Sequence, residues 1–195
     1  MSRITRVALG VAGALAASAA LAGSAQASLV APATDCGTPE ITQPFAAFGD
    51  ANGYKLVDGG AFEDGAPGWK LNGAARVVAG NHPFAGGESS LKIPAGSSAV
   101  SAPVCVGHEE PTLRFFARGA GTLTVSVQVT LVTGTVLTLP IGVDVGSSWN
   151  PTAPLGIVAN YLPAPGEDTA VRFVFTPLLG EWQIDDVYVD PRNRA

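Results

Sequence analysis

Two pairs of acidic residues could supply the two carboxylates of a glycoside hydrolase, namely Glu63 with Asp186 and Glu109 with Glu110. That reaction needs one acid with a raised pKa inside a groove and a second acid across the scissile bond. The sequence around these residues shows no sign of a groove. Acidic neighbours in a chain of this composition are usually solvated or linked to a metal ion, so we do not favour this chemistry.

Nucleophilic catalysis finds little support either. The chain has two histidines, His82 and His108, and both lie in polar loop sequences where a solvated histidine is far commoner than a catalytic one. It has no G-x-S-x-G motif, and Ser147-Ser148-Trp149 lacks the glycines of a nucleophile elbow. No nucleophile, base and orienting group can be assembled from these residues. We therefore predict that the protein is not an enzyme, with a small hydrolase as the least favoured alternative.

Aromatic rings offer a different chemistry, because the C–H faces of sugars stack on exposed rings while amides and acids bind the hydroxyls. The possible platforms are Tyr54, Trp69, Trp149 and Tyr161. Trp69 and Trp182 follow the pattern of core residues, whereas Trp149 is the residue least obviously in core register. We predict Trp149 and Tyr161 as ligand-binding residues. The alternative for Trp149 is that it covers a sheet edge from its loop.

The N-terminus has the features of a cleavable signal peptide. Arg3 and Arg6 precede an apolar stretch over residues 7–21, and Ala25-Gln26-Ala27 fits the small-x-small pattern of signal peptidase sites. A membrane-spanning helix is the competing interpretation, but the apolar stretch is short and no basic stop-transfer run follows it. We expect cleavage after Ala27 and a secreted, extracellular protein with no membrane span afterwards.

Composition narrows the possible partners. Removing residues 1–27 takes away two arginines and no acid, so 11 basic residues become 9 against 16 acids and the formal charge moves from −5 to −7. Nucleic acids and anionic membranes attract clustered Lys and Arg, so this balance argues against both as partners. The remaining 168 residues suit one domain, and the many Gly and Pro residues suit an all-β protein rich in turns.

The two cysteines, Cys36 and Cys105, both lie in the part expected to be exported. In an oxidising compartment such a pair most simply forms one disulfide, which would close a long loop. A lone pair this far apart makes a poor zinc site, and neither residue belongs to a C-x-x-C redox motif. We predict a structural Cys36–Cys105 disulfide that ties the N-terminal arm to the domain.

Hydrophobic patterning predicts strands along the rest of the chain. Residues 28–50 hold three prolines without periodicity and are expected to form an irregular arm, followed by one domain over residues 51–195. In residues 122–131 apolar and polar side chains alternate strictly, and Thr133-Gly134 then turns the chain into a second strand over 136–143. Nine to eleven short strands at this spacing predict an all-β, two-sheet antiparallel sandwich.

Two short motifs resemble the opening and closing strands of the galactose-binding-like jelly roll, the sandwich shared by many carbohydrate-binding modules. They are GGAFEDG at residues 59–65, followed by Trp69, and WQIDDVYVD at residues 182–190. The resemblance covers residues 54–190. The arm around Cys36, together with residues 102–106 and 114–118, also resembles small secreted bacterial proteins. The resemblance implies a fold more strongly than a ligand.

The same resemblance implies that the two end strands pair and that a structural Ca²⁺ lies between Glu63 and Asp185, with backbone carbonyls near Gly59, Gly60 and Trp69 as further ligands. Six to eight hard oxygens are the donors that Ca²⁺ prefers.

Strand parity complicates this assignment of the calcium ligands. A regular strand would turn Asp186 inward rather than Asp185, and a bulge would reverse that. Alternatively, Glu63 and one Asp cap turns, or pair with Arg76 or Arg172 at the surface.

The resulting hypothesis is a secreted, non-catalytic binding module for carbohydrate or cell-envelope glycan. The alternative is a structural or adhesive extracellular protein without sugar specificity. A glycan or a cell-envelope surface would be the partner in the first case.

Overall fold

The computed structural model describes residues 28–190, in which fourteen β-strands and two 3-10 helices are found. The predicted signal peptide, residues 1–27, lies outside the described residues. No helix within residues 28–190 is long and apolar enough to cross a membrane. The strands are β1 (Ile41–Thr42), β2 (Tyr54–Leu56), β3 (Lys70–Asn72), β4 (Arg76–Ala79), β5 (Ser89–Pro94), β6 (Ser98–Val100), β7 (Val104–Val106), β8 (Thr112–Gly119), β9 (Thr122–Thr130), β10 (Val136–Asp144), β11 (Asn150–Pro151), β12 (Leu155–Gly156), β13 (Thr169–Leu179) and β14 (Glu181–Asp190). The helices are η1 (Ala46–Phe48) and η2 (Val158–Tyr161).

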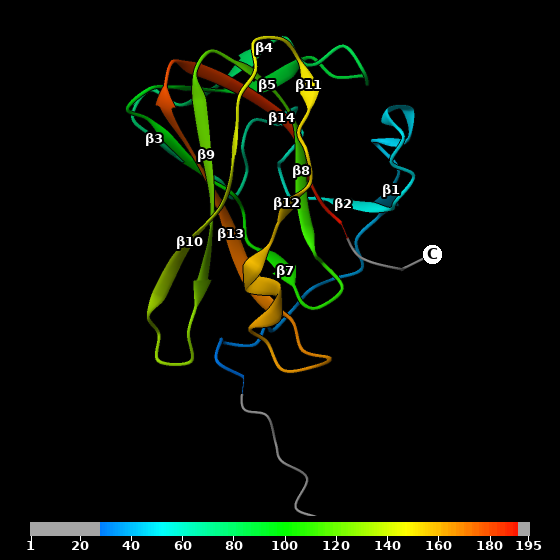
Figure 1. Cartoon of the computed structure of the whole chain (residues 1–195), viewed down its shortest axis with the longest axis vertical. Helices are drawn as coiled ribbons and strands as arrows, with labels where there is room; N and C mark the ends of the chain where they lie inside the picture. Colours follow the sequence, from blue (N-terminus) through cyan, green and yellow to red (C-terminus); the bar gives the residue numbers. More distant parts are fainter. Residues whose placement is uncertain (1–27, 191–195) are drawn as a thin grey trace, which may run out of the picture.

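These strands form two antiparallel sheets around one core (Figure 1). The larger sheet has the order β1-β2-β14-β5-β4, and β14 also pairs with β8, which in turn pairs with β11 and β12. The smaller sheet has the order β10-β9-β13-β6-β3, with β7 also on β13. This confirms the predicted all-β jelly-roll sandwich. The predicted strand number is too low, because strands of two residues, such as β1, β11 and β12, are too short to give a periodic signal.

The alternating segment is confirmed as strand β9. Its side chains alternate between half-buried and buried along the whole strand, with Leu123, Val125, Val127 and Val129 in the core. A strand with one face on a core needs this period of two. Its partner β10 follows a turn at Gly134, whose φ of +82° suits a residue without a Cβ.

The first and last strands of the domain lie side by side, as the resemblance implied. Tyr188 and Val189 of β14 pair with Leu56 and Lys55 of β2. The pairing continues into the glycine-rich motif, where the Val187 N–H donates to the Gly60 carbonyl at 3.1 Å. The two short sequence motifs are therefore adjacent in space, which places Glu63 near the middle of β14.

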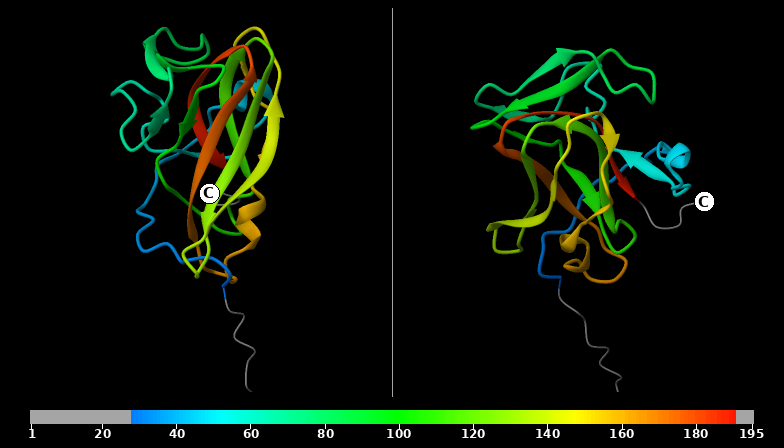
Figure 2. Two further views of the ribbon diagram at one scale, coloured as in Figure 1. Left: turned by 90° about the vertical axis from the view of Figure 1, so that its left-hand side faces the viewer. Right: turned by 45° about the horizontal axis from the view of Figure 1, so that its top comes forward.

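The N-terminal arm is packed against the larger sheet. Its strand β1 pairs with β2, and the two project from one side of the sandwich (Figure 2, right). The fully buried Phe45 packs against Tyr54 and Phe116 on the outer face of this sheet, away from the main core. The Arg114 guanidinium lies over the Phe45 ring, 4.2 Å from its centre. The arm thus completes a second, aromatic core.

A buried charge network holds this second core. Asp50 accepts hydrogen bonds from the Tyr54 hydroxyl at 2.6 Å and from Arg114 Nη1 at 2.5 Å. Burial opposes ionisation of the Asp50 carboxyl, but the hydrogen bonds from Tyr54, the Asn52 N–H and Arg114 outweigh it and lower the pKa of Asp50. Asp50 therefore stays ionised. Because Asp50 lies in the arm, two residues after η1, its bond to Arg114 fixes the arm to β8.

The predicted disulfide is present. Cys36 and Cys105 are bonded, with Cα atoms 5.5 Å apart and a sequence separation of 69 residues. The bond joins the arm to β7. Two isolated bridges fix the arm further upstream, between Val30 and Leu131 and between Pro32 and Thr169.

Removing this disulfide with the Cys36→Ser/Cys105→Ser double variant is expected to lower the free energy of unfolding by about 2–4 kcal/mol. The reason is the entropy that the unfolded chain regains when a long closed loop is opened. Urea unfolding followed by tryptophan fluorescence measures the change. Wild-type protein unfolded in the presence of reductant should match the double variant, and equal midpoints with and without reductant would contradict the prediction.

Candidate functional site

A β-bulge in β14 sets the orientation of the two adjacent aspartates. Asp185 pairs with Phe116 and Tyr188 pairs with Arg114. Between these two pairs β14 advances by three residues while β8 advances by two, so β14 contains one extra residue. The extra residue is accommodated at Asp186, which has a φ of +48°. Asp185 is buried, with 1% of its surface exposed, and Asp186 is half-buried. Asp185 is therefore the more buried of the two aspartates, and it shares with its partner Phe116 the face of the sheet that lies away from the main core.

Asp185 is the most perturbed acid of this region. Burial raises the pKa of Asp185 to about 8, and the charges of Asp186 and Glu63 add to the rise. Hydrogen bonds from the backbone N–H groups of Asp186 and His82 act in the opposite direction. The charge of Glu63 has the smallest of these effects, which places Glu63 within electrostatic range of Asp185. We call Glu63, Asp185 and Asp186 the acidic cluster.

Glu63 also fastens a loop. Its carboxylate accepts hydrogen bonds at 3.0 Å from the backbone N–H groups of Glu88 and Ser89, at the end of the segment 80–88 that joins β4 to β5. A Cβ at Gly87 would collide with the side chains of Asn81 and Glu63, so this close approach requires glycine. Neither Arg76 nor Arg172 pairs with Glu63; their guanidinium groups donate to the carbonyls of Ala74 and Ser101 instead. Of the two alternatives, capping a turn is the one the structure supports for Glu63.

His82 fastens the other end of the same loop and corrects an expectation. We expected a solvated loop histidine, but its side chain is fully buried. The Phe84 N–H donates to His82 Nδ1 at 3.2 Å, so Nε2 carries the proton and donates to Asp186 Oδ2 at 3.0 Å. The imidazole stacks on the Phe116 ring with centres 3.8 Å apart. Tertiary packing from β8 and β14 buries it, which no local sequence pattern reveals.

Above His82 lies a group of partly exposed aromatic rings, which we call the aromatic patch: Phe48, Phe84 and Trp149 around Phe116. Phe48 is 39% exposed and Phe84 is 45% exposed, and their rings meet edge to face at 5.0 Å. Trp149 is half-buried, with its ring 6.1 Å from that of His82. Three separate segments contribute to it: η1, the loop 80–88 and the residue preceding β11.

Polar groups border the aromatic patch. The Arg118 guanidinium lies 5.2 Å from the centre of the Trp149 ring and donates to Gln183 Oε1 at 2.6 Å. Asn150 follows Trp149 directly and is exposed. Exposed rings next to a guanidinium and two amides are the combination that binds the faces and hydroxyls of a sugar.

The remaining candidate platforms lie elsewhere. Tyr54 is buried, and Trp69 packs on Phe62 and Phe175 at 5.0 and 5.8 Å. Tyr161 is 68% exposed in η2, near the exposed His108. Trp149 and Tyr161 are not brought together, because β11 pairs with one end of β8 and β12, which leads into η2, pairs with the other end.

Three of the four carboxylates considered for glycoside hydrolysis are held by other contacts. Asp186 is held by His82, and Glu63 by the loop that it fastens. Glu110 is buried and pairs with Lys55 at 3.0 Å, while Glu109 is exposed. Neither pair faces the other across a groove in the described part of the chain.

The acidic cluster fits a hard cation in charge and in donor type. Glu63 lies within electrostatic range of Asp185, and Asp185 is a buried carboxyl that no basic side chain within residues 28–190 neutralises. Three His, Cys, Asp or Glu side chains in a metal-binding arrangement are not found in the described range, so backbone carbonyls would have to complete the ligand set. Two of the predicted carbonyls are partly used, since Gly59 accepts from the Phe62 N–H and Gly60 from the Val187 N–H. A carbonyl oxygen has a second lone pair for a cation.

No protein-family model and no curated protein matches this sequence. Solved structures do match its fold. The N-terminal tandem of CBM22-1 and CBM22-2 from Paenibacillus barcinonensis Xyn10C is 15% identical, with a TM-score of 0.53 over 74% of this chain and 47% of that chain. The enzymatically active domain of bacteriophage CBA120 tailspike protein 4 is 15% identical, with a TM-score of 0.50 over 69% of this chain and 21% of that chain.

A third solved structure is a single module. The CBM22-1 xylan-binding domain of the same Paenibacillus protein is 14% identical with a TM-score of 0.49, over 69% of this chain and 93% of that chain. The chain spans about a fifth of the tailspike structure and about half of the tandem. Identities this low establish the fold alone. The chain has the jelly-roll sandwich found in carbohydrate-binding modules, as its two end motifs predicted.

Proposed function

We propose that the protein is a secreted, non-catalytic module that binds glycan, and that the aromatic patch is its binding surface. The observation that carries this proposal is the combination of exposed Phe48 and Phe84 with Trp149, bordered by Arg118 and Gln183. The rings supply flat faces for sugar C–H groups, and the rim supplies donors and acceptors for hydroxyls. One similar solved structure is described as a xylan-binding domain and another as a complex with β-1,4-galactotriose, so xylan and β-1,4-galactotriose are the first probes to use.

The aromatic patch is favoured over the outer face of the smaller sheet. The outward side chains near the middle of the central strands there are four hydroxyls, one amide, one valine and one arginine: Thr124, Ser126, Gln128, Thr130, Arg172, Val174 and Thr176. That face offers hydrogen bonds but no flat aromatic ring on these two strands, so it lacks the stacking surface that sugar binding uses.

Replacing Phe84 and Trp149 together by Ala is expected to weaken binding to a responsive polysaccharide by at least tenfold. Truncating central aromatic residues of an interface costs about 1.4 kcal/mol or more, which corresponds to that factor. A glycan array first identifies the responsive polysaccharide, and affinity electrophoresis or calorimetry then gives the ratio. Tyr161→Ala is the matched control, because Tyr161 is an exposed aromatic residue far from the patch.

Three results would each carry a distinct meaning. Loss of binding in the Phe84/Trp149 variant with intact binding in Tyr161→Ala supports the aromatic patch. The reverse result would move the site to η2. A silent array, with no polysaccharide retained by wild-type protein, would reject glycan binding and favour a structural or adhesive role.

We further propose that a structural Ca²⁺ binds between Glu63 and Asp185. When bound, the ion supplies two positive charges that compensate these carboxylates and stabilise the ionised form of Asp185. Glu63 would hold it from the loop side and Asp185 from the β14 bulge, while Asp186 stays with His82. Support comes from the electrostatic influence of Glu63 on Asp185 and from the burial that raises the pKa of Asp185.

A further inference from the structure

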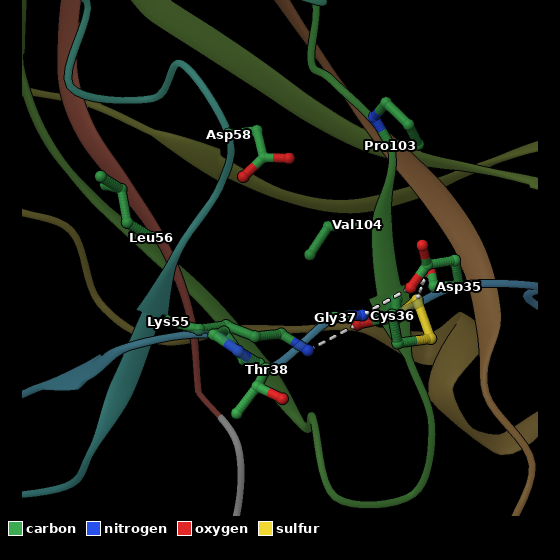
Figure 3. A pocket seen from close by; sticks show the side chains of 11 residues that line it. Asp35, Cys36, Gly37, Thr38, Lys55, Leu56, Asp58, Pro103 and Val104 are labelled. Carbon is green, nitrogen blue, oxygen red and sulfur yellow. Dashed lines mark hydrogen bonds between the residues drawn. A yellow bond between two sulfur atoms is a disulfide. The ribbon is translucent and has the colours of Figure 1, made fainter.

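A cavity of about 380 Å³ lies beneath the arm, remote from the aromatic patch. Three segments far apart in the sequence form its walls: residues 35–39 of the arm, residues 55–58 in and after β2, and residues 103–105 at β7 (Figure 3). The Cys36–Cys105 disulfide is part of the wall and fixes the arm to β7. A cavity of this size lies within the range of small-ligand sites.

Four polar side chains line the cavity: Asp35, Thr38, Lys55 and Asp58. Lys55 is buried, and its ammonium donates to the Cys105 carbonyl at 2.7 Å and to Glu110 at 3.0 Å. An ammonium has three N–H donors, so one remains for a ligand. Asp35 uses one oxygen to accept the Gly37 N–H at 3.0 Å, which leaves its second oxygen as an acceptor.

The charges of these groups select the kind of ligand. Buried Glu110 neutralises Lys55, so the carboxylates of Asp35 and Asp58 make the wall negative and disfavour anions. A hydroxyl group can accept from the free Lys55 N–H and donate to a carboxylate, and therefore satisfies both kinds of group at once. A ligand with several neighbouring hydroxyls can therefore hydrogen-bond to both the donors and the acceptors of this wall, which a single charged group cannot do.

The rest of the wall is apolar. Pro39, Leu56, Pro103 and Val104 line it, and Leu56 is 39% exposed despite its position beneath the arm. Figure 3 shows Leu56, Val104 and Pro103 around the space that Asp58 and Lys55 border. Such a surface suits the C–H face of a ring, so the cavity combines hydroxyl partners with an apolar wall.

We propose that this cavity binds one hydroxylated ring, such as the terminal residue of a glycan. This site is separate from the aromatic patch and goes beyond the proposed function, because a small cavity open to solvent holds a single ring whereas an extended patch can follow a chain. Asp58 and Thr38 bind the hydroxyls, the third N–H of Lys55 donates to one of them, and the proline and aliphatic side chains cover a ring face.

The three tryptophans give each region its own reporter. The Trp69 indole N–H donates to the backbone carbonyl of Asp58, a wall residue, at 2.8 Å. Trp149 belongs to the aromatic patch, and Trp182 is fully buried in the main core. The three indole N–H signals of ¹⁵N-labelled mature protein, assigned with Trp→Phe variants, therefore report on the cavity, the patch and the core.

Titration with xylose, galactose or glucose is expected to shift the Trp69 indole signal and leave that of Trp182 in place. Asp58→Ala should weaken this binding about tenfold or more, because a hydrogen bond to a charged group is stronger than one between neutral groups. Thr38→Val should also weaken it. Asp64→Ala, which removes an exposed acid outside the cavity, is the matched control and should bind as the wild type does.

The outcomes separate this proposal from the proposed function. A Trp149 signal that moves while Trp69 stays fixed at millimolar sugar would overturn the cavity proposal and leave the aromatic patch standing. Movement of Trp69 alone supports the cavity and counts against the patch. Shifts at Trp69 that persist unchanged in both Asp58→Ala and Thr38→Val would also reject the cavity site.

Discussion

His82→Ala is expected to lower the free energy of unfolding by about 3–5 kcal/mol and to abolish glycan binding at the aromatic patch. The cost has two sources. Truncating a fully buried ring that stacks on Phe116 leaves a void of ring size. The two hydrogen bonds of the imidazole, to Asp186 and from the Phe84 N–H, are lost with it.

Binding should suffer because His82 positions Phe84. The loop 80–88 is fastened by His82 at one end and by Glu63 at the other, and Phe84 stands between these two attachments. Without the imidazole, the Phe84 backbone loses its acceptor and the ring loses its neighbour at 5.8 Å. Urea unfolding gives the stability, and polysaccharide affinity measured well below the unfolding transition gives the binding.

Two variants of Asp186 separate the hydrogen bond from backbone strain. Asn and Gly both tolerate the φ of +48° at this position, but only Asn keeps a side-chain oxygen for the His82 Nε2–H. Asp186→Asn should therefore bind glycan close to the wild-type level, whereas Asp186→Gly should bind more weakly. Equal affinity of the two variants, or a His82→Ala protein that binds as the wild type does, would exclude His82 as a positioning residue.

The main sandwich could be predicted because its signals are local. In β9 each core side chain is two residues from the next, so burial follows directly from the sequence. The Trp182–Asp190 motif likewise identified strand β14, whereas the Gly59–Gly65 motif forms turns directly after β2, the strand that pairs with β14. Export context and an even cysteine count were enough for the Cys36–Cys105 disulfide.

The site depends on information that local patterns lack. A bulge at Asp186 decides which aspartate is buried, and the only local sign is that Asp tolerates a positive φ better than most residues. Phe48 and Phe84 lie in irregular segments without periodicity, and they meet because the arm and the loop 80–88 both pack over β8. Trp149 could be singled out because it departs from the core register of its neighbours.

Asp185→Asn is expected to make the metal-free protein more stable at pH 8 and to leave it nearly unchanged at pH 4. Asp185 has a pKa of about 8 in the folded protein and an ordinary value of 3.8 when unfolded. Between these values the folded state binds a proton that the unfolded state has lost, so stability falls as pH rises. The slope approaches about 1.4 kcal/mol per pH unit in the middle of this window. Asn has nearly the same shape and no charge, so it escapes this loss.

Calcium should reverse the order of the two proteins. With chelator at pH 7.5 the wild type is expected to melt below Asp185→Asn, because its folded state must keep a proton on the buried Asp185 carboxyl that the unfolded state releases. Millimolar Ca²⁺ should raise the melting temperature of the wild type, since a ligand that binds only the folded state stabilises it, and should leave Asp185→Asn unmoved. Glu63→Gln is expected to lose the calcium response while keeping the pH dependence of the wild type. If chelator and calcium give the same wild-type melting curve, the acidic cluster is a loop fastening without a metal ion, and the steep pH dependence of the wild type relative to Asp185→Asn should remain.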